Sequence, residues 1–109
     1  MYKYLKFLTV LCMFMFSINM VHPQEKKLNV IVIGAHPDDA DGTAGGTAIK
    51  FAQLGHNVLF VSLTNGDAGH QSEGGGALAK RRRAEAQEAA KRFGVSYKVL
   101  ELRDRKSVV

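Results

Sequence analysis

The chain has 109 residues, a single cysteine and a formal net charge of +5. This length allows at most one domain, and one cysteine excludes an internal disulfide framework. The positive charge is concentrated at residues 80–83, where Glu85 and Glu88 follow and no aromatic residue is interleaved. The pattern indicates a solvated helix face and argues against a nucleic-acid partner.

Residues 1–22 are typical of a secretory signal peptide. Lys3 and Lys6 give a basic start, and residues 7–16 form an apolar run that is shorter than the roughly 20 residues of a membrane-spanning helix. Because residues 17–21 contain no clean small-x-small cleavage signal, a retained membrane anchor stays open as the alternative. We expect export to the periplasm or the extracellular space, with no stable membrane association after the signal is removed.

The first predicted strand, residues 29–33, is a continuous apolar run of the kind that is buried on both faces of a parallel sheet. The polar residues His36, Asp38 and Asp39 follow it. Pro37 lies among them, fixes its own backbone and turns His36 away from helical geometry. The three polar side chains are therefore presented from a rigid bend.

This bend has the composition of a metal site. Histidine and aspartate are both zinc ligands, and a carboxylate beside a metal ligand is well placed to act as a general base toward water. Two adjacent carboxylates, Asp38 and Asp39, would repel each other in a poorly hydrated pocket unless a divalent cation offset their charge. The alternative is an ordinary polar turn, because Pro-Asp-Asp is also common turn composition.

Four more elements are predicted after the bend. They are a helix that Asp41 or Thr43 caps and that runs to about residue 54, a strand at 58–63, a helix at 77–93 and a strand at 97–102. This order predicts the βαβαβ start of a Rossmann-like α/β/α layered fold with a mainly parallel sheet, truncated after the third strand. Gly42, Gly45 and Gly46 lack the spacing of a dinucleotide fingerprint, so a nucleotide-binding module is the weaker alternative.

Open parallel sheets bind their ligands at the carboxyl ends of the strands. The second strand brings Asp67 and His70 to the same edge as His36, and Asp104 lies just past the end of the third strand. We expect Asp104 to face this edge, where a carboxylate can bind sugar hydroxyls. His70 is either a third metal ligand or a surface residue of a substrate loop. His56 precedes the second strand and is expected on the surface at the opposite edge.

Arg82 falls within the apolar stripe of the helix predicted at residues 77–93. A guanidinium group in such a stripe needs polar partners. The structural alternative is an ion pair with Glu85 or with Asp67. The functional alternative is a contact with a hydroxyl or acyl oxygen of a substrate.

Several motifs occur in a characteristic order. They are Ala35-His36-Pro37-Asp38-Asp39, Gly45-Gly46-Thr47, Leu63-Thr64-Asn65-Gly66-Asp67-Ala68-Gly69 and Arg82-Arg83-Ala84-Glu85-Ala86, followed by Ala89-Ala90 and Phe93-Gly94. With them, residues 29–102 resemble the amino-terminal part of the PIG-L (LmbE-like) N-deacetylases, so residues 23–109 are expected to be that part of the domain. Two positions depart from the family pattern: Asp41 stands in for an acidic residue that usually follows the paired aspartates, and Asp67 occupies a position that is more often glutamate.

The resemblance implies a zinc-dependent N-deacetylase in which His36 and Asp39 bind Zn²⁺, Asp38 is the general base and Arg82 contacts the substrate. We predict Asp67 and Asp104 as further substrate-binding residues. The expected substrate is a small molecule or glycan, specifically an N-acetylglucosamine-type amino sugar or glycoconjugate.

The family's third zinc ligand is a histidine in a later motif, which the 109 residues do not reach. A catalytically inactive fragment is therefore one alternative, because two protein ligands hold zinc less well than three. A nucleotide- or sugar-binding module that needs no metal is another. Oligomer formation stays open, because a sheet of three strands has an open edge.

Overall fold

The computed structural model describes residues 1–18 and 25–104 of the chain. In chain order its elements are α1 (Tyr2–Ile18), β1 (Asn29–Gly34), α2 (Asp39–Gln53), β2 (Asn57–Thr64), α3 (Gly75–Phe93) and β3 (Ser96–Leu102). The five elements predicted after the first apolar segment are all present, in the predicted order.

Helix α2 begins earlier than predicted. Asp38, and not Asp41 or Thr43, precedes its first turn, and no side chain caps this end. The backbone N–H of Asp39 donates to the carbonyl oxygen of His36 at 3.2 Å, and that of Gly42 donates to the carbonyl oxygen of Asp38 at 3.0 Å. The bend therefore closes directly into the helix, with Asp38 immediately before its first turn and Asp39 within it.

The three strands form one parallel sheet in the order β1-β2-β3, which confirms the predicted parallel α/β class. Gly34 pairs with Ser62 near the carboxyl ends of β1 and β2, and Thr64 pairs with Leu102 near those of β2 and β3. A register irregularity lies between Ser62 and Thr64. The strand ends, and the loops that follow them, thus meet at one edge.

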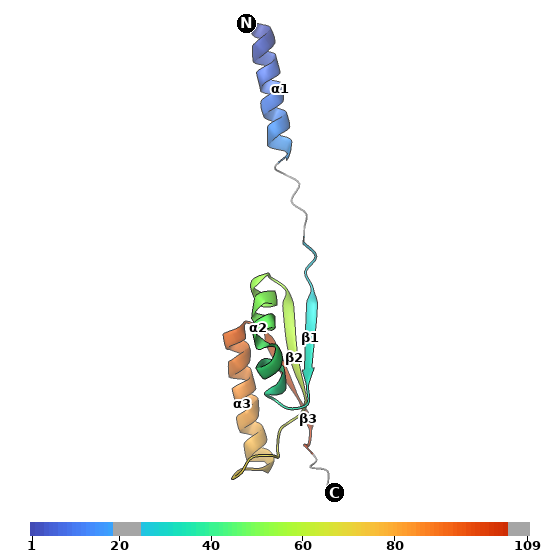
Figure 1. Cartoon of the computed structure of the whole chain (residues 1–109), viewed down its shortest axis with the longest axis vertical. Coiled ribbons are helices and arrows are strands. Elements are labelled where there is room, and N and C mark those ends of the chain that lie inside the picture. Colours follow the sequence, from blue (N-terminus) through green and yellow to red (C-terminus); the bar gives the residue numbers. More distant parts are fainter. Residues whose placement is uncertain (19–24, 105–109) are drawn as a thin grey trace.

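Helices α2 and α3 cover the same face of this sheet (Figure 1). Gly45 permits their close approach, because a Cβ atom at this position would lie 3.0 Å from Cε2 of Phe93. The core between helices and sheet consists of small residues on the helices and larger ones on the strands: Ala40, Ala48, Val58, Phe60, Ala86, Ala90 and Tyr97.

The opposite face of the sheet is open in the part of the chain that the structure describes. Ile31 and Ile33 of β1 are 60% and 64% exposed, although the apolar run predicted burial on both faces. The strand order explains the difference: both crossover connections have the same hand, so both described crossover helices lie on one side.

Helix α1 packs against no other described element. Its apolar side chains Tyr4, Leu5 and Leu8 are exposed. Within the described residues, no helix combines the length and the apolar character that crossing a membrane requires. Residues 19–22, where the predicted signal peptide ends, lie outside the described residues.

Truncation of a core side chain should destabilise the fold more than truncation of a side chain on the open face of the sheet. Phe60 is fully buried and contacts Phe93 and Tyr97 edge to face, with ring centroids 6.4 and 5.5 Å away. Phe60→Ala should lower the free energy of unfolding by about 3–5 kcal/mol, whereas Ile31→Ala on the open face should cost less than about 1 kcal/mol. Urea unfolding of the full chain, followed by circular dichroism, measures both, and equal losses would contradict this core.

Candidate functional site

Three loops are joined at the carboxyl edge of the sheet. The carbonyl oxygen of Ala35, after β1, accepts hydrogen bonds from the backbone N–H of Thr64 at 2.9 Å and from its hydroxyl at 2.8 Å. The backbone N–H of Asn65, after β2, donates to the carbonyl oxygen of Leu102 at 2.7 Å. The loop after β1 is thus fixed to the end of β2, and the loop after β2 to the end of β3.

His36 and Asp39 lie together in the first of these loops. The backbone N–H of His36 donates to Oδ2 of Asp39 at 2.8 Å, and ring atom Nδ1 of His36 lies 3.5 Å from the same oxygen. The backbone hydrogen bond from His36 is the main reason that the pKa of Asp39 is held below its usual value. Gly34 is required here, because a Cβ atom in its place would lie 2.6 Å from Cβ of Asp39.

This pair fits two ligands of one zinc ion. Two atoms bound to a tetrahedral zinc lie about 3.4 Å apart when each zinc–ligand bond is about 2.1 Å long. The separation of His36 Nδ1 and Asp39 Oδ2 is close to that value, and both side chains are about two-fifths exposed, at 40% and 43%. The predicted ligands are therefore brought together and are accessible.

Asp38 and Arg82 share a cavity of about 220 Å³ beside this pair. Its lining is mostly charged and consists of Pro37, Asp38, Asp41, Arg82, Glu85 and Ala86. Oδ1 of Asp41 accepts a hydrogen bond from the hydroxyl of Tyr97 at 3.3 Å. Burial, and then the nearby Asp41 carboxylate, raise the pKa of Tyr97, so its hydroxyl keeps its proton.

Arg82 is half-buried, as its place in the apolar stripe predicted, but its partners differ from those expected. Its Nη1 donates to the carbonyl oxygens of Gly66 and Ala68, at 3.1 and 3.2 Å. Among the described residues, it forms no ion pair with Glu85 or Asp67. Glu85 contacts Arg81 instead, at 3.7 Å. The guanidinium group therefore holds the loop after β2 in shape.

The carboxylate of Asp67 accepts hydrogen bonds from the two residues that follow β3. Its Oδ2 accepts a hydrogen bond from Nε of Arg103 at 3.0 Å, and its Oδ1 accepts one from the backbone N–H of Asp104 at 2.8 Å. These bonds, that from Arg103 first, hold the pKa of Asp67 below its usual value. Its predicted contact with a substrate stays a prediction. Arg103 was not singled out from the sequence, although its place beside Asp104 after a strand was a signal.

Asp104 lies at this edge, as predicted, and its side chain faces His36. Its Oδ2 is 3.2 Å from Nε2 of the His36 ring. Asp39 and Asp104 therefore contact opposite nitrogens of one imidazole and cannot both share a metal with it. Consistent with this, residues 1–18 and 25–104 contain no group of three or more His, Cys, Asp or Glu side chains arranged to hold a metal ion.

The other two histidines of the described sheet domain lie apart from this site. Nδ1 of His70 accepts hydrogen bonds from the backbone N–H groups of Ser72 and Glu73, at 3.3 and 3.2 Å. His70 is exposed, and this geometry favours the surface-loop alternative over a third metal ligand. His56 lies at the amino edge, where its Nδ1 accepts a hydrogen bond from the backbone N–H of Leu28 at 3.4 Å.

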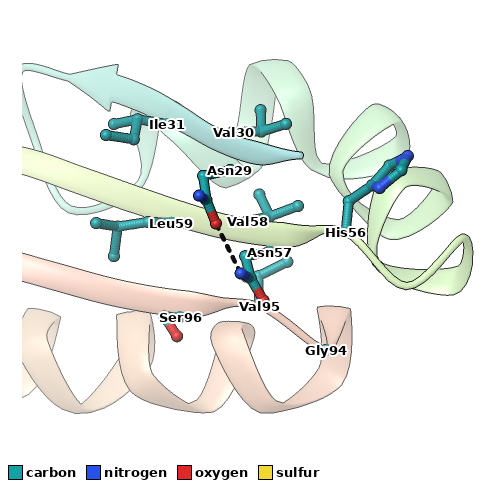
Figure 2. Close-up of a pocket in the computed structure, with 10 residues that line it drawn as sticks. All are labelled: Asn29, Val30, Ile31, His56, Asn57, Val58, Leu59, Gly94, Val95 and Ser96. Carbon is teal, nitrogen blue, oxygen red and sulfur yellow. Dashed lines mark hydrogen bonds between the residues drawn. The ribbon is translucent and has the colours of Figure 1, made fainter. Parts of the chain in front are cut away.

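A larger hollow of about 470 Å³ adjoins His56 at this amino edge. Figure 2 shows it across the starts of the strands, with the amide of Asn57 donating to the side-chain oxygen of Asn29 at 2.6 Å. The described residues that line it include no carboxylate. The concentration of acids and of His36 at the carboxyl edge identifies that edge, and not the larger hollow, as the candidate functional site.

Fold and site together define a parallel α/β protein with a histidine–carboxylate site at the carboxyl ends of its strands. The model of the PIG-L family, described as GlcNAc-PI de-N-acetylase, matches residues 31–108. The chain therefore belongs to the PIG-L family, and its relatives include deacetylases.

Among its relatives is the 1D-myo-inositol 2-acetamido-2-deoxy-alpha-D-glucopyranoside deacetylase of Corynebacterium jeikeium, 34% identical over 89 residues, which are 69% of this chain and 27% of that protein. The structure of N,N'-diacetylchitobiose deacetylase from Pyrococcus horikoshii is similar with a TM-score of 0.65 and 35% identity, over 75% of this chain and 32% of that chain. The 4-carboxy-2-hydroxymuconate hydratase of Pseudomonas putida is similar with a TM-score of 0.62 and 26% identity, over 68% and 34%. The chain thus spans about a third or less of the length of these relatives.

The packing of Arg82 against the loop after β2 can be tested by substituting two glycines of that loop. Gly66 has a φ of +68°, and a Cβ atom there would lie 2.8 Å from Cδ of Arg82 and 2.9 Å from Cδ of Pro37. Gly69 has a φ of +91°, and a Cβ atom there would have no atom of the described neighbouring residues within 4 Å. Both glycine-to-alanine variants should lose about 1–2 kcal/mol through the left-handed backbone, but Gly66→Ala should lose about 1–3 kcal/mol more through overpacking. Urea unfolding of both variants measures the difference, and equal stabilities would contradict the packing described.

Proposed function

We propose that this chain provides the catalytic edge of a zinc-dependent hydrolase that removes the N-acetyl group of an N-acetylglucosamine-type amino sugar or glycoconjugate. The observation that carries the proposal is the 3.5 Å approach of His36 Nδ1 to Asp39 Oδ2, directly beside Asp38. Two relatives support the substrate class, since their names describe deacetylases of an acetamido sugar and of diacetylchitobiose.

In this proposal His36 and Asp39 would hold the zinc ion. The lowered pKa of Asp39 supports its role, because the carboxyl group stays ionised in the range where a metal ligand must be deprotonated. When bound, zinc supplies Lewis-acid chemistry: it polarises an acyl carbonyl and lowers the pKa of water. Catalytic zinc sites typically have three protein ligands, so a group outside the described residues would complete the set.

Asp38 acts as the general base. Its exposed carboxylate takes a proton from the attacking water while the water oxygen bonds to the acyl carbon. The carbon–nitrogen bond then breaks, and the carboxyl group of Asp38 returns the proton to the departing amine nitrogen. The products are acetate and the free amino sugar.

Arg82 positions the substrate in the cavity that it shares with Asp38. Among the described residues, Arg82 donates hydrogen bonds only through Nη1, to the loop carbonyls, and a guanidinium group has five N–H donors. Its other donors can therefore bind a sugar hydroxyl or the acyl oxygen at the cavity wall, while the loop bonds keep the group in place.

Substitutions of the two adjacent aspartates should impair different properties, zinc binding for Asp39 and the rate of hydrolysis for Asp38. Asp39→Asn should weaken zinc binding by the full chain at least about tenfold, because it changes a ligand. Asp38→Asn should bind zinc like the unaltered chain but release amine from N,N'-diacetylchitobiose about 10²–10⁴ times more slowly, because it removes the general base. Competition with a chromophoric chelator measures the first effect, and fluorescent amine detection the second.

Glu88→Gln is the matched control, since Glu88 is an exposed residue of α3 that contacts Arg92. Amine release that persists undiminished after zinc is removed by a chelator, or that Asp38→Asn leaves unchanged, would contradict the proposed reaction.

We further propose that residues 1–22 direct export and are then removed. The basic residues Lys3 and Lys6, and the exposed apolar surface of α1, support this proposal. In a bacterial host, the tagged full chain should appear in the periplasm or medium with a new amino terminus near residue 23, as determined by intact-mass spectrometry. Leu8→Arg should block this processing by interrupting the apolar run. A full-length product that stays in the cytosol would contradict export.

A further inference from the structure

The imidazole of His36 lies between two carboxylates. Asp39 Oδ2 is 3.5 Å from its Nδ1, and Asp104 Oδ2 is 3.2 Å from its Nε2. A neutral imidazole carries one N–H donor and one acceptor lone pair. Which carboxylate faces the donor therefore decides which nitrogen is free to bind another group.

We infer that Asp104 is a positioning residue that keeps the ring proton of His36 on Nε2. Its carboxylate faces Nε2 at the shorter of the two distances and is only 21% exposed. With the proton on that side, the Nδ1 lone pair stays free at 3.5 Å from Oδ2 of Asp39, a spacing that suits two ligands of one cation. The metal part of this inference rests on the proposed function. A carboxylate on the second nitrogen of a ligating histidine fixes the tautomer and the orientation of the ring.

Asp104 is itself held in place from the loop after β2. Its backbone N–H donates to Oδ1 of Asp67 at 2.8 Å, and Arg103 donates to the other oxygen of the same carboxylate. Asp67 is fixed in turn, because its side chain is only 8% exposed and its backbone N–H donates to Oδ1 of Asn65 at 3.1 Å. Asp67 thus sets the position of Asp104, and Asp104 that of the His36 ring.

In this arrangement Asp104 and Asp67, which lie at the same carboxyl edge of the sheet, have different roles. Oδ2 of Asp104 faces His36 and, among the described residues, its Oδ1 accepts no hydrogen bond, so a contact with a sugar hydroxyl and a positioning role are compatible. Asp67 accepts hydrogen bonds at both oxygens from the residues that follow β3, and these bonds hold Asp104 in place.

The tautomer of His36 provides a test that needs no metal. In the metal-free full chain with isotope-labelled histidine, at a pH where the ring is neutral, the ring nitrogen chemical shifts should show the proton on Nε2. Asp104→Ala should move the proton population toward Nδ1, which then faces Asp39 alone. Glu101→Ala, which also removes a carboxylate but at an exposed position near the end of β3, should leave the tautomer unaltered.

Zinc affinity is the second readout. Asp104→Ala should lower the affinity about 10–100-fold in competition with a chromophoric chelator, while Glu101→Ala should not. If Asp104→Ala does not fold, as judged by circular dichroism, Asp104→Asn decides, because an amide oxygen is a weaker acceptor than a carboxylate and the changes keep their sign.

The two readouts separate this inference from the proposed function. An unchanged His36 tautomer in a folded Asp104 variant overturns the positioning role, whether or not the chain binds zinc. A shifted tautomer supports the role. If His36 of the unaltered chain carries its proton on Nε2 and Asp104→Ala shifts it, but the unaltered chain binds no zinc, the positioning role stands and the zinc-dependent function fails.

Discussion

Parallel pairing of three consecutive strands forces their carboxyl ends onto one edge of the sheet, and the site depends on this constraint. The loops that leave the strands are then joined by hydrogen bonds, from Thr64 to the carbonyl of Ala35 and from the end of β3 to Asp67. Residues that are far apart in the sequence, such as His36 and Asp104, come within 3.2 Å as a result. Had the sheet been antiparallel, consecutive loops would have alternated between its two edges.

Local sequence patterns were sufficient to predict the strands, the helices and the sheet edge at which His36, Asp39 and Asp104 lie together. Apolar runs and the glycines that end them are local signals, and the bend at Pro37 marks where the polar candidate residues follow the first strand. The partners of the charged residues were not predictable in the same way. Arg82 binds loop carbonyls and Asp67 binds Arg103, because these contacts depend on the loop path at Gly66 and on a register irregularity after Ser62.

Family membership establishes the fold and the relationship to deacetylases. The proposed reaction has to be argued from individual residues. The solved relatives include a deacetylase and a hydratase that share the fold of this chain, in line with the rule that one fold supports several reactions. The proposed amide hydrolysis therefore rests on the pairing of His36 with Asp39 and on Asp38 beside the cavity. The carboxylates of Asp67 and Asp104 form the surrounding layer that orients this group.

Anomalous X-ray diffraction at the zinc absorption edge, from crystals of the full chain grown with zinc, tests the central claim most directly. If His36 and Asp39 bind zinc as proposed, an anomalous peak lies within bonding distance of both Nδ1 of His36 and a carboxylate oxygen of Asp39. A peak at His56 or His70 instead, or no peak beside His36 and Asp39 at saturating zinc, would contradict it.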